Sequence, residues 1–271
     1  MSRLLHISDT HFGTEQPPVV EALRAMAHEL RPEVVVLSGD ITQRARAAQF
    51  AAARAFCDSL QVQHLLTLPG NHDIPLYNLA ARLLQPYAGY MAAFGRELEP
   101  VLDLPSLLVI GVNTTRPARH KDGEISAAQI NRVVHLLRRG RSGQLKVVVT
   151  HQPACVMRPE DEPDRLHGGE AAVKAWSRAG ADLVLGGHIH LPYLSDLCAL
   201  KVVPDGRTYC LQAGTAVSHR VRHGTPNSVN LVHWEAPSAQ GQRRCKVERW
   251  DYDLADARFE PTHTYELELA A

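Results

Sequence analysis

Short apolar runs recur along the first 190 residues, and most of them are followed at once by Asp, Asn or His. The runs span residues 3–8, 33–39, 64–69, 107–113, 145–150 and 182–187. Each is short and rich in Val, Leu and Ile, which is typical of strands buried in a sheet. Amphipathic stretches lie between several of them, and this alternation predicts an α/β fold around a central sheet.

Three of the stretches between the runs have helical periodicity. Apolar residues recur at helical spacing over residues 20–30 and again over residues 50–60. The third stretch opens with Ser126 and Gln129, which form a capping-box pattern, and Gly140 is expected to end it. These features predict three helices packed on the sheet.

The chain changes character after about residue 200. Residues 208–214, 229–236 and 245–254 look like strands joined by turns, without helical patterns between them. We therefore expect a single domain over residues 1–271, with two sheets packed face to face and a C-terminal part made mainly of strands. These last strands also offer an edge at which two copies could pair into a dimer.

Composition excludes several classes of protein. The chain is 45% hydrophobic and 21% charged, which is ordinary for a globular protein. Its 29 basic and 29 acidic residues cancel, so the chain lacks the net positive charge typical of proteins that bind nucleic acid or anionic membranes. Its five cysteines are widely spaced and form no CxxC pair, which argues against a disulfide framework and predicts a reducing cytoplasm. The N-terminal segment has no apolar stretch long enough for a signal peptide or membrane span.

Metal-binding residue types follow five of the six runs. They are Asp9 and His11, Asp40, Asn71 with His72 and Asp73, His151, and His188 with His190. Each has a simpler explanation when taken alone, because an Asp after a strand often caps a helix or forms a turn. The carboxyl ends of strands in an open α/β sheet converge on one crevice, however, so together these residues predict a ligand site.

The number of candidates predicts two metal ions. Seven of these side chains are counted as ligand candidates: Asp9, His11, Asp40, Asn71, His151, His188 and His190. Seven is more than one ion can use, and two ions sharing a carboxylate would account for them all. No cysteine is among them, which argues against a structural zinc site. If residues 188–190 stay extended, His188 and His190 point to the same side of the chain.

The order of these motifs resembles the calcineurin-like metallophosphoesterase superfamily. The matching blocks are DTH at 9–11, GD at 39–40, GNHD at 70–73, His151, and GHIH at 187–190. The resemblance implies a four-layer α/β/β/α sandwich of two mixed sheets, with a dinuclear metal site at the carboxyl ends of the strands. It implies that Asp9, His11 and His190 hold one ion, that Asn71, His151 and His188 hold the other, and that Asp40 bridges them.

Other features narrow the branch of this superfamily. GDITQRA at 39–45 departs from the GDxVDRG block of the protein phosphatases, and the chain has little room for the DNA-capping region of repair nucleases. GNHDIPLYN, GEISAAQI and residues 213–232 are similar to bacterial cyclic-nucleotide and glycerophosphodiester phosphodiesterases. We therefore expect a cytoplasmic phosphodiesterase that hydrolyses a small diester by attack of a metal-bridged hydroxide. A nuclease, a phosphomonoesterase and a non-catalytic metal-binding scaffold are the alternatives.

Several residues are expected to contact the substrate. The resemblance implies that His72 contacts the phosphate and is a candidate acid for the leaving group, and a purely structural role behind the metal ligands is its alternative. Arg220 and Arg222, with His219 and His223, are further candidates because Arg pairs well with phosphate. Asn113 and Arg116 are weaker ones, and the polar loop at 158–168 either borders the site or is simply exposed. The expected cofactors are two divalent or trivalent ions, Mn²⁺ or iron, with Zn²⁺ as the alternative.

Overall fold

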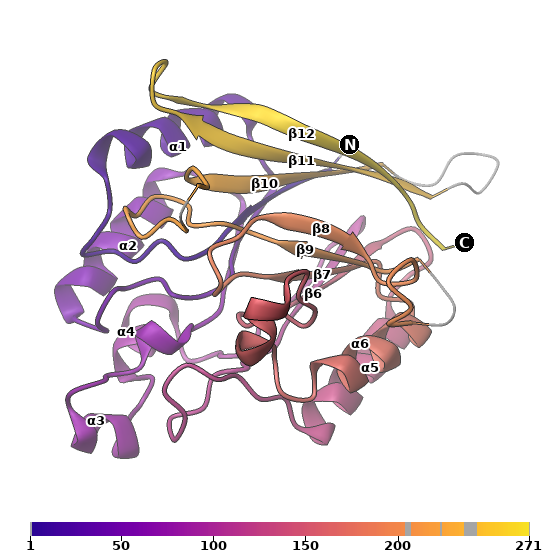
Figure 1. The fold of residues 1–271 in the computed structure, drawn as a ribbon, viewed down its shortest axis with the longest axis horizontal. Helices are drawn as coiled ribbons and strands as arrows, with labels where there is room; N and C mark the ends of the chain where they lie inside the picture. The colour runs from indigo at the N-terminus through magenta and orange to yellow at the C-terminus, as the bar shows by residue number, and fades with distance from the viewer. Residues whose placement is uncertain (1, 204–206, 223, 236–242, 271) are drawn as a thin grey trace.

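The computed structural model describes residues 2–203, 207–222, 224–235 and 243–270. Within these residues the chain forms two mixed six-stranded sheets with helices on their outer faces (Figure 1). His223, one of the predicted substrate contacts, lies outside the described residues. No helix in the described part of the chain is both long enough and apolar enough to cross a bilayer.

The first sheet has the order β12-β11-β10-β1-β2-β3. Strands β1 to β3 run parallel, and β10, β11 and β12 add antiparallel strands beyond β1. The bounds are β1 (Ser2–Ile7), β2 (Val34–Leu37), β3 (His64–Thr67), β10 (Ser228–Trp234), β11 (Arg244–Asp253) and β12 (Arg258–Glu268).

The second sheet has the order β4-β5-β6-β7-β9-β8. Its four inner strands run parallel, and the two edge strands, β4 and β8, are antiparallel to their neighbours. The bounds are β4 (Val101–Asp103), β5 (Leu107–Gly111), β6 (Leu145–Val149), β7 (Leu183–Gly186), β8 (Tyr193–Asp196) and β9 (Tyr209–Gln212).

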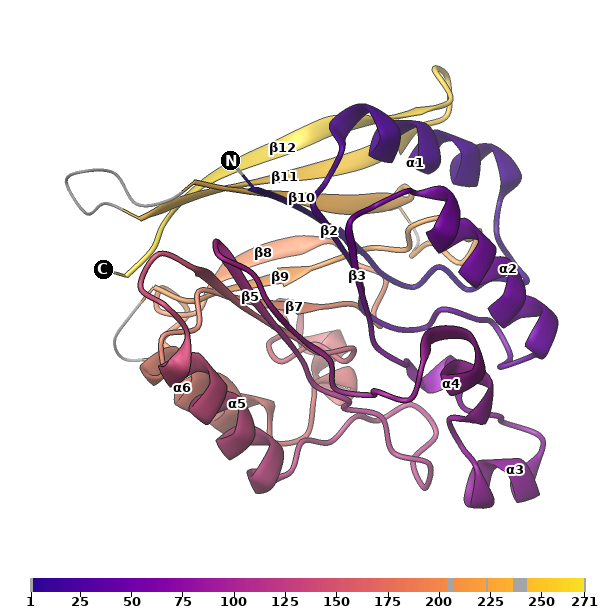
Figure 2. The same ribbon diagram turned by 180° about the vertical axis from the view of Figure 1, so that it is seen from behind.

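Helices cover the outer faces of both sheets, as Figure 2 shows from behind. The α-helices are α1 (Pro17–Leu30), α2 (Ala47–Ser59), α3 (Leu79–Leu84), α4 (Ala88–Phe94), α5 (Ala127–Arg139) and α6 (Gly169–Arg178). Two 3₁₀ turns, η1 (Asn71–Asp73) and η2 (Pro159–Asp164), lie in loops.

Alternating side chains of the strands divide the interior into separate cores. In β1, Leu5 and Ile7 pack towards α1 and α2, whereas Leu4 packs against the second sheet. A third core lies between the second sheet and the helices α5 and α6, where Trp176 is fully buried. The result is the predicted four-layer α/β/β/α sandwich, so the fold class is confirmed.

The six apolar runs all form strands, and the three predicted helices appear as α1, α2 and α5. Ser126 caps α5 as its sequence predicted, because its hydroxyl accepts from the Gln129 backbone N–H at 3.2 Å. The sequence pattern missed α6. It also missed the edge strand β12, most of whose side chains are exposed. All five cysteines are free, in agreement with the expected absence of a disulfide framework.

Candidate active site

Loops after five parallel strands bring the predicted metal ligands together. Strand β1 leads to Asp9 and His11, β2 to Asp40, β3 to Asn71, β6 to His151, and β7 to His188 and His190. Since β1, β2 and β3 belong to one sheet and β6 and β7 to the other, the site spans both sheets. It lies at the carboxyl ends of the strands, where α/β sheets bind their ligands.

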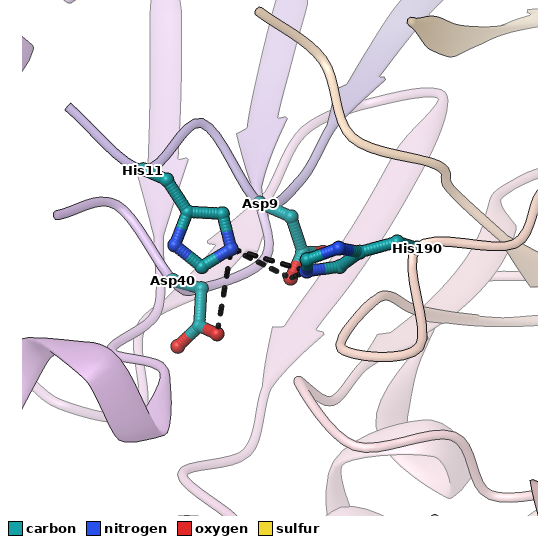
Figure 3. Close-up of side chains that lie close together, drawn as sticks. All are labelled: Asp9, His11, Asp40 and His190. Atoms are coloured by element: carbon teal, nitrogen blue, oxygen red, sulfur yellow. Dashed lines mark hydrogen bonds and ion pairs between the residues drawn. The ribbon is translucent and has the colours of Figure 1, made fainter. Parts of the chain in front are cut away.

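The first ligand group consists of Asp9, His11, Asp40 and His190 (Figure 3). Each offers one ligand atom, and these four atoms lie within 4.8 Å of one another. The Nε2 atom of His190 is 3.1 Å from His11 Nε2 and 3.2 Å from Asp9 Oδ1. That Asp9 oxygen is buried and makes no hydrogen bond. A buried carboxylate oxygen without a hydrogen bond, facing two imidazole nitrogens, fits a metal cation.

The backbone of this group is held in an unusual conformation. Asp9, His11, Asp40 and His190 have φ angles of 53°, 44°, 46° and 56°. This left-handed region costs an L-residue roughly 1–2 kcal/mol. Hydrogen bonds between the loops maintain it, from Asp9 N to Gly39 O at 3.1 Å and from His11 N to Asp40 O at 2.9 Å. Strain of this kind, sustained by surrounding structure, is concentrated at functional sites.

Gly187 lets the β7 loop approach Asp9 closely. A Cβ atom on this glycine would lie 1.9 Å from Ser8 Oγ and 2.4 Å from Asp9 Oδ2. In the space that remains, Asp9 Oδ2 accepts from Ser8 Oγ at 2.6 Å and from the backbone N–H of His188 at 2.9 Å. These two bonds orient the carboxylate so that its other oxygen, Oδ1, faces the imidazoles.

The second ligand group consists of Asp40, His151 and His188, with Asn71 beside them. The Nε2 atom of His151 lies 3.2 Å from Asn71 Oδ1 and 3.3 Å from Asp40 Oδ1. His151 Nδ1 donates to the carbonyl of Ser38 at 2.9 Å, which fixes the ring and directs Nε2 into the group. His188 Nδ1 is buried without a hydrogen-bond partner, so it is available as a ligand.

Asp40 is the residue common to both groups. Its Oδ2 atom faces His11 Nε2 at 3.8 Å, whereas Oδ1 faces His151 Nε2 at 3.3 Å. One carboxylate thus presents one oxygen to each set of imidazoles. This arrangement fits a carboxylate that bridges two ions.

Electrostatics favour cations at this position. Burial raises the pKa of Asp40, but the neighbouring His151 and His72 outweigh burial and hold it well below its ordinary value. Burial lowers the pKa of His151, yet the charge of Asp40 and the hydrogen bond to it raise the value to about 9. Burial lowers the pKa of His11 to about 3, which keeps that imidazole neutral and able to bind a metal.

The histidines of GHIH do not follow the expectation for an extended chain. β7 ends at Gly186, and both His188 and His190 have positive φ angles, 72° and 56°. The two side chains therefore enter different groups, His190 the first and His188 the second. Side-chain alternation failed here because the strand had already ended.

Asp73 supports the Asn71–His72 turn from beneath. Its carboxylate accepts from the backbone N–H groups of Gly70 and Thr42, both at 2.8 Å, and of Ile41 at 3.0 Å. Burial, and next the charge of Asp40, raise the pKa of Asp73 to about 6, against the effect of these bonds. Asp73 is thus a positioning residue that ties the loop after β3 to the loop after β2.

His72 lies beside the ligand groups and contacts Arg220. Its Nδ1 donates to the carbonyl of Gln43 at 3.0 Å, and its Nε2 lies 4.0 Å from Asp40 Oδ2. The Nη1 atom of Arg220 is 3.2 Å from His72 Nε2 and 3.3 Å from His11 Nδ1, and it donates to Gln43 Oε1 at 3.0 Å. Within the described ranges no carboxylate pairs with Arg220, so its positive charge remains available to an anion.

Arg222 pairs with an acidic segment, and its contact with a substrate stays a prediction. Its Nη1 atom lies 2.7 Å from Asp161 Oδ1, and its Nη2 atom lies 3.8 Å from Glu160 Oε1. The same acidic segment borders the second ligand group, where Asp164 Oδ1 is 3.9 Å from His188 Nε2 and 2.7 Å from Lys121 Nζ. The loop at 158–168 is therefore part of the site's surroundings.

The remaining predicted contacts lie in local networks. His219 is exposed, and its backbone N–H donates to the carbonyl of Thr14 at 3.1 Å. Asn113 is buried and accepts from Thr115, while Arg116 donates to the carbonyl of Asn113 at 3.1 Å and to Gln129 Oε1 at 2.8 Å. Contact of these residues with a substrate remains a prediction.

A small depression beside the ligand groups adds residues that the sequence did not single out. Its volume is about 20 Å³, and its lining comprises Gln43, Arg44, Asn71, His72, Ile74, Leu76 and His120. Gln43 and Arg44 directly follow the GDIT motif, and His120 precedes GEIS by three positions. Their position next to these motifs was the only sequence signal for these three residues. That they line one depression follows from the fold and could not be seen in the sequence.

Comparison with known proteins places these residues in context. A sequence model of the calcineurin-like phosphoesterase family matches residues 2–192. The glycerophosphodiester phosphodiesterase GpdQ of Enterobacter lignolyticus (strain SCF1) is 36% identical over an 83-residue alignment that covers 26% of this chain and 29% of that protein. The similarity to this curated relative thus spans less than a third of its length.

Solved structures share the fold at low sequence identity. Purple acid phosphatase PPD1 from yellow lupin (Lupinus luteus) superposes with a TM-score of 0.71 at 11% identity, over 98% of this chain and 53% of that chain. A dimetal phosphatase from Danio rerio gives a TM-score of 0.67 at 12% identity, over 99% of each chain. At such identities the likeness shows the fold alone.

Proposed function

This chain belongs to the calcineurin-like phosphoesterase family, and we propose that it is a metal-dependent phosphodiesterase acting on a small phosphodiester. Membership supports phosphoester hydrolysis with two divalent metal ions. The finer assignment to diesters is our own. The alignment with a glycerophosphodiester phosphodiesterase and the departure of residues 39–45 from the protein-phosphatase block both favour it.

The observation that carries the proposal is the position of Asp40. One oxygen of this buried carboxylate faces His11 and the other faces His151. We propose that Asp9, His11 and His190 hold one ion, that Asn71, His151 and His188 hold the other, and that Asp40 bridges them. Ions held there would neutralise charge on the phosphate and lower the pKa of water, so that a nucleophile exists near neutral pH.

The surrounding side chains have separate tasks in this proposal. Arg220 binds a non-bridging phosphate oxygen, because its guanidinium lies against His72 and His11 without a carboxylate partner among the described residues. His72 contacts the phosphate and is placed to pass a proton to the leaving oxygen, with its ring fixed by the Gln43 carbonyl. Asp73 holds the loop that carries both His72 and Asn71.

The identity of the metals, the location and the assembly state are proposed here as the sequence predicts them. Carboxylate, imidazole and amide ligands suit Mn²⁺, iron or Zn²⁺, and the absence of a cysteine in either ligand group agrees with that choice. A cytoplasmic location and a dimer remain predictions.

Turnover of paired substrates tests the function. Bis(p-nitrophenyl) phosphate and p-nitrophenyl phosphate release the same chromophore from a diester and a monoester. We expect chelated protein to be inactive and Mn²⁺-reconstituted protein to hydrolyse the diester with the higher kcat/KM. A preference for the monoester would instead support a phosphomonoesterase. Absence of turnover of either substrate, with both metals bound, would contradict the proposal.

A further inference from the structure

Exposed apolar side chains are concentrated at one place near the site. Tyr77 is 79% exposed, Leu79 66%, Leu83 75% and Leu84 81%, and all four lie in the short segment that contains α3. This helix projects at the periphery of the molecule in both views (Figures 1 and 2). Scattered exposed apolar residues are ordinary, but a cluster of this kind indicates a surface that a ligand or partner covers.

The Tyr77 end of this cluster is joined to the catalytic groups. The Arg44 guanidinium carbon lies 5.9 Å from the centre of the Tyr77 ring, within the range of a cation–π contact. Arg44 also lines the depression that contains Asn71 and His72, and His120 lines the same depression. A continuous surface therefore runs from the metal ligands through Arg44 to the ring of Tyr77.

A buried arginine holds both sides of this surface. Arg82 donates through Nη1 to the carbonyl of Pro75 at 3.2 Å and through Nη2 to the carbonyl of Arg119 at 2.7 Å. Pro75 lies two residues before Tyr77, and Arg119 directly precedes His120. One side chain thus fixes the spacing between the two segments, which gives the surface a defined width.

The chemistry of this surface favours an aromatic, anionic ligand. Its depression is lined by no carboxylate, and Arg44 has no ion-pair partner among the described residues. The depression, at about 20 Å³, has room for little more than one water molecule, so a large substituent has to lie across the rim. An exposed tyrosine ring stacked by a guanidinium offers a flat face to a planar group.

We propose that Arg44, Tyr77 and His120 form a platform for the nucleobase of the substrate. The inference rests on the proposed function and sharpens it, because it selects a nucleotide diester over a glycerophosphodiester. The phosphate lies at the ligand groups beside Arg220, and the base stacks on Tyr77 while Arg44 and His120 flank the connecting sugar. Base–aromatic stacking is sequence-tolerant, so the platform accepts purine and pyrimidine bases alike.

Equilibrium binding of two phosphate monoesters separates the base from the phosphate. Adenosine 5′-monophosphate and glycerol 3-phosphate carry the same phosphate group, and only the first has a base. Calorimetry on Mn²⁺-loaded wild type, with phosphate release followed in parallel, is expected to show about tenfold tighter binding of the nucleotide. Tyr77→Ala should remove about tenfold of that affinity and change glycerol 3-phosphate binding less than twofold.

Matched variants distinguish stacking from a structural effect. Tyr77→Phe keeps the ring and should retain nucleotide affinity, and Leu254→Ala, which truncates an apolar side chain that is also exposed, should change neither ligand. Equal wild-type affinity for the two ligands, or equal weakening of both by Tyr77→Ala, would overturn the platform. So would light scattering that shows Tyr77→Ala separating a dimer without altering nucleotide selectivity, since a second copy would then cover the patch.

Failure of the platform and failure of the proposed function give different results. A wild type that hydrolyses phosphodiesters but binds both monoesters equally keeps the phosphodiesterase and loses the platform. A wild type that binds the nucleotide selectively through Tyr77 yet hydrolyses no diester keeps the platform and loses the phosphodiesterase.

Discussion

Two flanks of the candidate site differ in how their charges are used. The cationic flank consists of Gln43, Arg44, His72, His120 and Arg220, and the acidic flank is the segment 158–165. On the acidic flank, Asp161 pairs with Arg222 and Asp164 with Lys121, so the opposite charges neutralise one another. On the cationic flank, neither Arg44 nor Arg220 has a carboxylate partner within the part of the chain that is described.

This difference indicates the direction from which an anionic substrate binds. Unpaired cations attract a phosphodiester, whereas a carboxylate already paired with a cation contributes little field at a distance. We infer that the acidic flank holds its loop against the second ligand group and that the cationic flank binds the substrate. Substitutions on the cationic flank should therefore lower kcat/KM, and substitutions on the acidic flank should mainly lower stability. Substitution of Asp40, which lies between the flanks, should have the largest effect on kcat/KM.

The largest effect is expected between the flanks, at Asp40. Asp40→Asn removes the charge that both ligand groups share, so both ions should be weakened together. We expect kcat/KM to fall by more than about a hundredfold, since loss of residues that merely support a metal ligand already costs 10–100-fold. Kinetics and metal analysis measure the effect. Asp58→Asn, at an exposed helix position paired with Arg54, is the control and should be unchanged. Full activity in Asp40→Asn would contradict the bridging role.

A smaller effect is expected on the cationic flank, at Arg220. Arg220→Ala removes the guanidinium that lies against His72 and His11, and a lost charge-assisted hydrogen bond is worth about 1.5–3 kcal/mol. The corresponding loss in kcat/KM is about 10–150-fold. Arg220→Lys keeps the charge but loses the planar fork, so it should recover part of the activity. An unchanged kcat/KM in Arg220→Ala would remove this residue from the phosphate site.

The smallest effect on activity is expected on the acidic flank, at Arg222. Arg222→Ala should change kcat/KM less than about threefold if its guanidinium only pairs with Asp161, but it leaves that buried carboxylate without its cation. An unpaired buried charge costs about 3–5 kcal/mol, so thermal unfolding should shift clearly to lower temperature. A rise in KM as large as that of Arg220→Ala, with stability unchanged, would instead confirm Arg222 as a substrate contact.

Sequence patterns predicted the ligand groups because each ligand lies in a short motif directly after a strand. Asp9, Asp40 and His151 could each be placed at the carboxyl end of a parallel strand from the strand pattern alone, although those strands belong to two different sheets. The partner of Arg222 could not be predicted in this way. It is set by the contact of two loops that lie about sixty residues apart in the chain.

The remaining features that the sequence did not predict depend on backbone conformation or on position at the surface. The directions of His188 and His190 depend on left-handed backbone after β7, which a strand pattern does not contain. Arg44, Tyr77 and His120 come from three loops. Arg44 and Tyr77 lie within GDITQRA and GNHDIPLYN, but only the folded chain shows that Arg44 is a neighbour of both Tyr77 and His120. β12 was missed because an edge strand with exposed side chains lacks the apolar run that marks a buried one.

The stoichiometry of metal binding tests the two-ion site most directly. Chelated wild-type protein is titrated with Mn²⁺ in a calorimeter, and the ions retained per chain are counted by elemental analysis. We predict two ions per chain in the wild type and a loss of binding in Asp40→Asn. One ion per chain, or two ions bound as tightly to Asp40→Asn as to the wild type, would contradict a centre bridged by Asp40.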